Sequence, residues 1–325
     1  MIETKTPPLQ VIERESGKRV LDYAGEEKYA ESFGYEWEHY SRTYSDQEIG
    51  GDLSRKRLEL NLGFPLDFLK EKNVLEIGCG AGRFTEHLVK HAKQVIAIDL
   101  SRAVFCNSAL GAPNLLAIRA DLYELPEFSE PIDVVFCRGV IQHTPDPRRS
   151  LKRLFDYVRD DGLVIFDVYK KLPNDRWSFK YFWRPFFKRN IPLKSFDRYI
   201  NRHARFLYTA HHFLLKIHSR IPVWRRLIAK TPLYLSANWE TQYPKQTRKE
   251  REEVFKNEFV DMLYAEYDQP MTSQEVIDCL AEIGQVPYSY DLGRNHFRYK
   301  KRPDRTPLFV RFTKNGIAET PYVTS

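Results

Sequence analysis

Three acidic residues and a run of alternating glycines carry the ligand-binding chemistry that this sequence predicts. Glu76 stands two residues before Gly78, and Gly80 and Gly82 follow at alternating positions. Glycines in such a turn allow positive φ and leave room for a ligand, while the N-terminus of a following helix offers unpaired N–H groups. We therefore predict a ligand-binding turn within residues 74–84, between a strand and a helix.

The glycines alone do not identify the ligand, because nicotinamide, flavin and S-adenosylmethionine (SAM) proteins all use glycine-rich first turns. The spacing acid-x-Gly-x-Gly-x-Gly, which begins at Glu76, differs from the dinucleotide pattern Gly-x-Gly-x-x-Gly and favours SAM. Asp99 ends a second apolar run and can accept hydrogen bonds from a ribose diol, although NAD proteins share such an acid. Asp121 follows a third run, where it can accept from an adenine amine. Acids at three consecutive strand ends together indicate a SAM site.

These residues resemble the motifs of the class I SAM-dependent methyltransferases, and specifically the broad bacterial group of small-molecule methyltransferase domains. The resemblance covers about residues 70–170 and rests on segments 74–83, 95–101, 120–122 and 139–147. It implies that Glu76 and the glycines hold the methionine part of SAM, that Asp99 with Leu100 holds the ribose, and that Asp121 with Leu122 frames the adenine. A Rossmann-like domain for another nucleotide and a methyltransferase fold without activity are the alternatives.

Groups that could act on a methyl acceptor follow the fourth and fifth predicted strands. In an open α/β sheet, ligands bind beyond the carboxyl ends of the strands. His143 lies in the loop after the fourth strand and is a candidate general base or acceptor-positioning group; packing against the following helix is the alternative role. Tyr169, at the tip of the fifth strand, and Tyr40, in an aromatic segment at residues 33–44, are the next candidates.

The elements that must position these groups predict an α/β fold with a seven-stranded, mostly parallel Rossmann-like sheet and helices on both faces. Apolar runs predict strands at residues 74–77, 94–98, 115–119, 132–137, 163–168, 286–292 and 308–313. Spacing and capping signals predict helices at residues 54–62, 84–89, 148–158, 253–264 and 273–283. The predicted organisation is an N-terminal arm and aromatic cap (1–53), a SAM-binding core (54–170), a basic helical insertion that serves as a lid (171–250), and C-terminal helices and strands that return to the core (251–325).

The N-terminal part divides into two stretches of different composition. Residues 1–25 combine prolines and charges without periodicity, which predicts a loosely ordered arm with one short strand near residues 9–12. Residues 33–44 crowd aromatic side chains together. They are expected either to pack a helix against the sheet or to cap the cofactor and substrate pocket.

Positive charge is concentrated in residues 171–230, which hold 15 Lys or Arg but only two acidic residues, a net charge of +13 in a chain whose total is +7. Thirteen aromatic residues are interleaved with these charges, including Trp177, Trp183 and Trp224. This pattern suits an anionic membrane surface, a nucleic acid or an acidic substrate. A helical lid with a solvated outer face is the simpler interpretation. Among partners, an anionic membrane surface or lipid-linked acceptor is favoured over nucleic acid, because no RNA-binding module accompanies the segment.

The composition of the chain limits the cellular location and the metal chemistry that we expect. The 325 residues can bury a full core, no run approaches 18 apolar residues, and the N-terminus does not resemble a signal peptide. We expect a cytoplasmic protein, or one that lies peripherally at the inner membrane surface. The four cysteines have no metal-ligand spacing, so no metal site and no magnesium-dependent catechol chemistry are expected.

The function predicted from these observations is methyl transfer from SAM to an oxygen of a small molecule, a sugar or a lipid-linked glycan. A sulfonium methyl is already activated, so placement of the nucleophile matters more than acid-base chemistry. Two alternatives remain open: an RNA methyltransferase that uses the basic insertion, and a SAM-binding protein that docks a partner without turnover.

Overall fold

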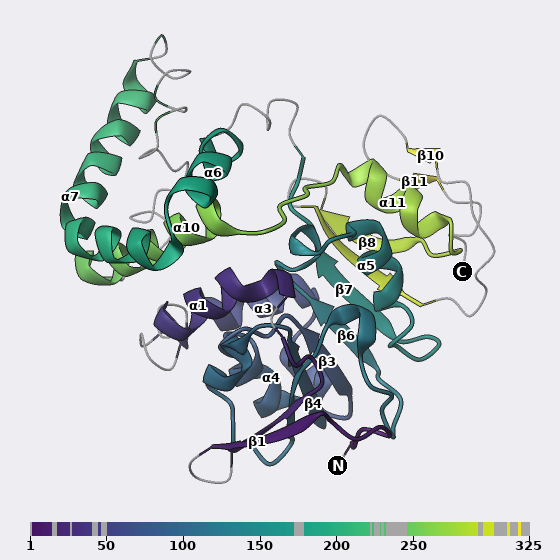
Figure 1. Cartoon of the computed structure of the whole chain (residues 1–325). Coiled ribbons are helices and arrows are strands. Elements are labelled where there is room, and N and C mark those ends of the chain that lie inside the picture. The colour runs from purple at the N-terminus through teal and green to yellow at the C-terminus, as the bar shows by residue number, and fades with distance from the viewer. Residues whose placement is uncertain are drawn as a thin grey trace.

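The protein has an α/β fold with a central mixed sheet and a separate helical lobe (Figure 1). The computed structural model describes residues 2–14, 18–26, 28–40, 45–46, 51–171, 179–221, 223, 228, 231, 246–291, 295–301, 311–312 and 318–319. Several sequence features fall outside these residues, including Trp177, Trp224 and most of segment 222–245. The predictions made for them are therefore not tested.

The central sheet has nine strands in the order β1-β2-β5-β4-β3-β6-β7-β9-β8. The strands are β1 (Gln10–Arg14), β2 (Lys18–Asp22), β3 (Asn73–Ile77), β4 (Gln94–Asp99), β5 (Leu115–Arg119), β6 (Val134–Cys137), β7 (Leu163–Asp167), β8 (Pro287–Asp291) and β9 (His296–Lys300). β2 to β7 pair in parallel, whereas β1, β8 and β9 pair antiparallel. The predicted mostly parallel sheet is confirmed, and the strand count differs because six of the seven expected strands are joined by the hairpin β1–β2 and by β9.

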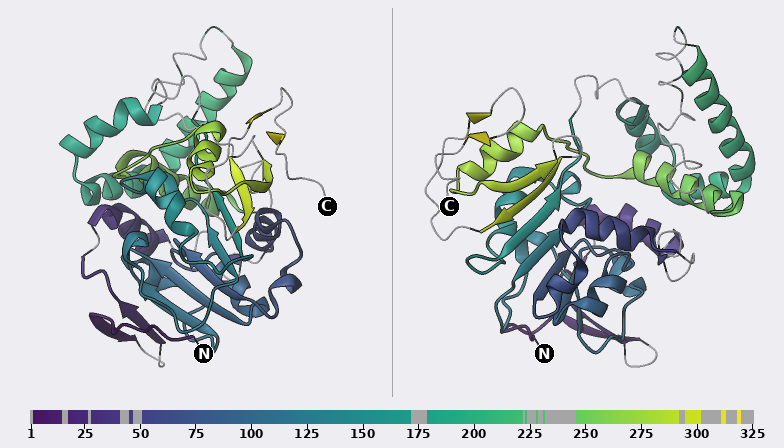
Figure 2. Two further views of the ribbon diagram at one scale, coloured as in Figure 1. Left: turned by 90° about the vertical axis from the view of Figure 1, so that its right-hand side faces the viewer. Right: turned by 180° about the vertical axis from the view of Figure 1, so that it is seen from behind.

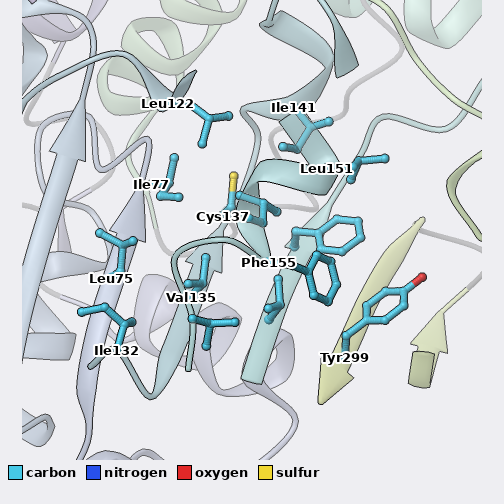
Figure 3. Packing of buried hydrophobic residues seen from close by; sticks show 14 of the residues in the cluster. Leu75, Ile77, Leu122, Ile132, Val135, Cys137, Ile141, Leu151, Phe155 and Tyr299 are labelled. Carbon is cyan, nitrogen blue, oxygen red and sulfur yellow. The ribbon is translucent and has the colours of Figure 1, made fainter. Parts of the chain in front are cut away.

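Both faces of the sheet are buried, which explains the continuous apolar runs of the strands. Successive side chains of a strand point to opposite faces. Leu75 and Ile77 pack on one face with helices α5 (Pro147–Leu154) and α11 (Ser273–Ala281), as Figure 3 shows for part of this cluster. Val74 packs on the other face with α3 (Leu53–Leu62) and α4 (Thr85–His91). The two faces fix the register of the strands that carry the glycine turn.

Two predictions about the ends of the chain were wrong. The short strand expected near residues 9–12 is present as β1, but the described part of the arm is not loosely ordered, because β1 and β2 form a hairpin and β2 joins β5 in parallel. Among the described residues, the last strand of the central sheet is β9, and the described part of 308–313 does not join this sheet. Phe297 and Tyr299 of β9 pack into the core, and their charged neighbours alternate with them, so the strand lacks a continuous apolar run. Of residues 308–313, only Arg311–Phe312 is described, as β10, which pairs with β11 (Ala318–Glu319) in a separate two-stranded sheet.

The insertion after β7 forms the helical lobe, which we call the lid. It contains α6 (Phe179–Asn190), α7 (Leu193–Arg220) and α10 (Arg248–Tyr264). Phe196 and Leu207 of α7 share an apolar cluster with Phe255 and Phe259 of α10, so the described lid extends to Tyr264 and not only to residue 250. The right-hand view of Figure 2 shows the lid beside the sheet, with α1 (Glu31–Tyr40) between them.

The topology places one crevice at a switch in strand order. β3 lies between β4 and β6, so the connections that follow β3 and β6 leave toward opposite sides of the sheet. Ligands in open α/β sheets bind at such a point, beyond the carboxyl ends of the strands. The glycine turn after β3 lies at this crevice.

Candidate active site

The glycine turn requires its glycines for steric reasons. Gly78 has φ +77°, and a Cβ atom there would lie 2.0 Å from Cγ2 of Val140, in the loop after β6. Gly82 has φ +94°, and a Cβ would lie 2.4 Å from the Asn107 side-chain oxygen. The turn is thus pressed between two loops, and only glycine allows both close approaches.

Asp99, at the carboxyl end of β4, joins this turn to the ligand crevice. Its Oδ2 accepts a hydrogen bond of 2.8 Å from the Gly80 N–H, and its Oδ1 accepts from the Ser101 N–H and hydroxyl at 2.9 and 2.7 Å. Burial raises the pKa of the Asp99 carboxyl, and these hydrogen bonds oppose the rise. Each carboxylate oxygen has two lone pairs, so Oδ2 can still accept one hydrogen bond from a ribose hydroxyl.

Asp121 is held by the N-terminal region. It accepts hydrogen bonds from Lys28 Nζ at 3.1 Å and the Tyr29 hydroxyl at 3.2 Å, and it also bonds the Tyr123 N–H at 3.1 Å. Its carboxylate is not among the groups that line the cavity described next, whereas Leu122 is. The short helix that contains Lys28 and Tyr29 therefore closes the adenine end that the sequence predicts.

A cavity of about 260 Å³ extends from the glycine turn to the lid. Of the residues predicted to hold the cofactor, Gly78, Gly80, Asp99, Leu100 and Leu122 line it, and Glu76, Gly82 and Asp121 do not. The aromatic cap contributes Phe33 and Trp37, whose indole would lie 3.2 Å from a Cβ at Gly80. The aromatic segment thus covers the turn and does not only pack the sheet.

Glu76 lies beneath the turn and supports it. Its Oε2 accepts a hydrogen bond of 2.6 Å from the Thr85 hydroxyl at the start of α4, and Asn107 donates to that hydroxyl at 3.0 Å. Burial raises the pKa of the Glu76 carboxyl to about 8; Thr85 lowers it, and Asp99 raises it further. The residue ties β3, α4 and the loop after β4 together.

His143 lines the cavity with a defined tautomer. Its Nδ1 lies 2.8 Å from the Tyr267 carbonyl oxygen. A carbonyl only accepts, so Nδ1 carries the proton and Nε2 is the lone-pair nitrogen of the neutral ring. The ring packs between Phe33, at 4.8 Å, and Tyr169, at 5.3 Å between centroids. This arrangement holds the imidazole between the aromatic cap and the tip of β7.

The structure separates the two tyrosine candidates. Tyr169 lines the cavity and is 39% exposed, and desolvation of its hydroxyl in the cavity, with Asp261 and Glu258 nearby, raises the pKa of that hydroxyl above the usual value. Tyr40 is not a lining residue; its hydroxyl donates to Asp197 of α7 at 2.5 Å. Tyr169 is therefore a hydrogen-bond donor at neutral pH, and Tyr40 connects α1 to the lid.

An acidic wall from α1 and α10 lines the cavity, and the sequence did not point to it. It consists of Glu36, Glu258 and Asp261, with Asn257 beside them. Glu36 is buried, and burial together with Asp261 and Glu258 raises the pKa of its carboxyl well above the usual value, although an Asn257 hydrogen bond lowers it. The helix at 253–264 was predicted, but nothing in its local pattern shows which face meets the pocket.

A second polar cluster lies outside the cavity. One ligand atom each from Asp46, Glu86 and His87 fall within 4.8 Å of one another, a group that could hold a metal ion. Asp46 already accepts from the Ser54 and Arg55 N–H groups at the start of α3, and from His87 at 3.1 Å. These hydrogen bonds give the cluster a role in joining α3 to α4.

The fold and the crevice define a Rossmann-like nucleotide-binding domain of the methyltransferase type. Residues 49–212, half of the chain, match the family described as "Methyltransferase domain", and the chain belongs to this family. SAM is the cofactor of the family. The glycine turn, Asp99 and the adjoining cavity fit this cofactor, because Gly78 and Gly80 line a cavity of about 260 Å³ together with Asp99, a ribose acceptor, and with aromatic side chains of the cap.

Individual relatives match part of the chain. The ubiquinone biosynthesis O-methyltransferase of Coxiella burnetii (strain RSA 493 / Nine Mile phase I) is 29% identical over 104 residues, 31% of this chain and 44% of its own. That of Alkalilimnicola ehrlichii is 30% identical over 110 residues, 32% of this chain and 44% of its own. The N-methyltransferase NodS of Bradyrhizobium japonicum WM9 is 24% identical with a TM-score of 0.33, over 39% of this chain and 74% of its own. The chain thus spans about half the length of the curated relatives it matches.

Proposed function

We propose that the protein transfers the methyl group of SAM to a hydroxyl oxygen of a small molecule, with His143 as the general base. The observation that carries the proposal is the tautomer of His143, fixed by the Tyr267 carbonyl beside the glycine turn and its cavity. SAM supplies a methyl group already activated on a sulfonium. The protein's share is therefore to orient the acceptor and to remove its proton.

Two carboxyls, Asp167 and Asp268, lie near His143. Burial raises the pKa of Asp167, whereas Arg138, the Gly139 N–H and a charged His143 lower it. Burial also opposes the charge of Asp268, but Lys180, Arg184 and His143 lower its pKa below the usual value. Both carboxyls are therefore close enough to His143 for a charge on the imidazole to affect them.

The acceptor and the cofactor are proposed to occupy opposite ends of the cavity. Gly78, Gly80 and Asp99 would hold SAM, Glu76 would support the turn from below, and Tyr169 would donate a hydrogen bond to the acceptor. Curated relatives named O-methyltransferases support oxygen as the methylated atom. Labelled SAM with extracts rich in hydroxylated metabolites, followed by mass spectrometry for a +CH2 product, tests the assignment. SAM binding without any methylated product would favour a docking protein instead.

We also propose that the lid contacts an anionic membrane surface and so brings the enzyme to a lipid-linked acceptor. Tyr199, Phe206 and Phe213 of α7 are spaced by seven residues, which places them on one stripe, and they are 56%, 70% and 63% exposed. Phe182 and Phe186 of α6 are also exposed. Arginine and lysine side chains of α7 lie exposed around the stripe: Arg198, Arg202, Arg205, Lys216 and Arg220. Apolar rings among positive charges are typical of an interfacial helix.

The lid proposal concerns contact with a surface and not a membrane span. Among the helices that the structure describes, none is long and apolar enough to cross a bilayer. Vesicle binding tests the contact, and retention of RNA in place of vesicles would favour the RNA methyltransferase alternative.

A further inference from the structure

The acceptor end of the cavity carries more negative charge than the proposed methyl transfer needs. Glu36, Glu258 and Asp261 line this end, and Asp261 and Glu258 raise the pKa of both Glu36 and Tyr169. Both carboxyls of α10 are therefore close to α1 on one side and to the tip of β7 on the other. The acidic wall faces the same end of the pocket as His143.

Positive groups also lie at or near the cavity, and each has an aromatic or anionic partner. Arg83 and Arg138 line the cavity, and their guanidinium groups lie over the Phe84 ring, at 5.3 and 5.5 Å. Arg138 also pairs with Asp167 at 3.4 Å. Lys180, which reaches toward the Tyr169 ring, pairs with Asp268 at 2.7 Å. None of these cations contributes to the change in the pKa of Glu36.

Asp261 is half-buried, and its carboxylate has no hydrogen-bond or ion-pair partner among the described residues. It lines the same pocket as Glu36, whose side chain is buried and 5% exposed. Like charges held together in low dielectric repel one another, and a cation brought between them removes the repulsion. The wall is thus complementary to a positively charged ligand.

We propose that the methyl acceptor carries a positively charged amine, held by Glu36, Glu258 and Asp261 while its hydroxyl faces His143. The inference rests on the proposed function, since it describes the substrate class of the same pocket. The proposal also implies that the two faces of the lid differ in charge. The outer face of the lid is basic, whereas α10 contributes two carboxylates and an amide to the pocket.

Three phenols that differ in charge test the inference: tyramine, 4-ethylphenol and 3-(4-hydroxyphenyl)propionate. Each is titrated into the full chain saturated with S-adenosylhomocysteine, and binding is measured by calorimetry. Tyramine should bind about tenfold to a hundredfold more tightly than 4-ethylphenol, the factor expected for a charge-assisted hydrogen bond, and the carboxylate should bind most weakly. Equal affinity for the three, preference for the anion, or no binding of tyramine would overturn the proposal.

Substitutions identify the carboxylates responsible. Glu258→Gln and Asp261→Asn should each bring tyramine down toward the affinity of 4-ethylphenol, while Glu252→Gln should not. Glu252 is the matched control, since it lies on the same helix, pairs with Arg248 at 2.8 Å and is not a lining residue. An unchanged tyramine preference in Glu258→Gln and Asp261→Asn would remove the wall as the cation site.

Thermal unfolding of the unliganded protein gives a second readout that does not depend on the fit of a probe. If the carboxyls repel one another in the empty pocket, the double variant Glu258→Gln/Asp261→Asn should unfold about 1 to 3 °C higher than the parent. A lower midpoint would mean that the wall has a structural role and would contradict the proposal. Loss of S-adenosylhomocysteine binding in the parent would instead count against the proposed methyl transfer, because that step is measured before any probe is added.

Discussion

Asp99 and Gly80 are joined by a hydrogen bond of 2.8 Å from the glycine N–H to the carboxylate. The bond links the carboxyl end of β4 to the turn after β3, so the residue proposed to bind the ribose also shapes the turn proposed to bind the methionine part. The cofactor site is therefore one connected unit, and a change at Asp99 acts on both of its ends.

The first prediction follows from this link. Asp99→Ala should weaken SAM binding by several kcal/mol at most, since it removes the hydrogen bond proposed to the ribose and the one that holds the turn at Gly80, each charge-assisted and worth roughly 1.5 to 3 kcal/mol. Asp99→Asn, which keeps the shape and one acceptor, should lose less. Calorimetry measures both. Unchanged affinity in Asp99→Ala, or tighter binding of NAD than of SAM to the parent, would contradict the assignment.

His143→Ala should lower turnover by about 10² to 10⁴ and leave SAM affinity nearly intact, the range expected for a positioned proton acceptor. The pH-rate profile of the parent should fall at low pH, where a protonated His143 cannot act as a base. The variant has no imidazole at this position, so its profile should lose this acidic limb. If activity and the free energy of unfolding fall together, the histidine has a packing role between Phe33 and Tyr169, and the base lies elsewhere.

Stability should depend on pH through Glu76. The unfolded carboxyl loses its proton near pH 4.5, whereas the folded one keeps it until about pH 8. The folded state binds more protons in this window, so the free energy of unfolding should fall as pH rises, by about 1.4 kcal/mol per unit for one proton. Above about pH 8 this contribution should level off.

Urea unfolding between pH 5 and 8 checks this effect against Glu76→Gln. The amide can still accept from Thr85 but does not titrate, so its stability should fall less steeply with pH than that of the parent. Parallel curves for the two proteins would show that Glu76 keeps an ordinary pKa in the folded chain.

Tyr40→Phe should destabilise the protein by about 1.5 to 3 kcal/mol, because it removes a hydroxyl that donates to the buried Asp197 carboxylate. Tyr35 still donates to that carboxylate at 2.9 Å, so the charge is not left alone. Urea unfolding measures the loss, with Tyr288→Phe, an exposed residue, as the control. A large fall in turnover at unchanged stability would restore Tyr40 as a catalytic candidate.

Vesicle binding should require both the rings and the charges of α7. The double variant Phe206→Ser/Phe213→Ser should bind anionic vesicles more weakly, since each ring buries apolar surface worth roughly 1.5 to 3 kcal/mol. Arg202→Glu/Arg205→Glu should also bind more weakly, by about 1 kcal/mol per basic residue removed, an effect that fades as salt rises. Tyr288→Ser is the matched control away from the lid. Equal binding by all variants, or equal binding to neutral vesicles, would contradict the proposal.

Much of the sheet and the turn could be predicted from sequence because their signals are local. The run 115–119 matches β5, and Asp99 ends β4 as expected. The glycine spacing carries its own steric reason, as the approach of Val140 to Gly78 shows. β9 was missed because its charged residues alternate with buried aromatic ones. Its sequence therefore lacks the continuous apolar run that marked the other strands.

The acceptor end could not be predicted, because it is assembled from distant segments. The tautomer of His143 depends on Tyr267, which lies 124 residues away. Asp261 is one of several acids on α10, and only the packing of α10 against α6 and α7 decides that it faces the cavity. Similarly, Lys28 reaches Asp121 across 93 residues of sequence. No local sequence pattern predicts such contacts between distant residues.

The chain leaves the core for the lid and returns to it at almost the same place. Lys171 N–H donates to the Met271 carbonyl at 3.0 Å, and Met271 N–H donates to the Tyr169 carbonyl at 2.9 Å. An excursion of about a hundred residues whose two ends already lie side by side can be exchanged for another without moving a strand. The insertion is therefore free to differ in length and sequence without a change in the strands that carry the cofactor turn.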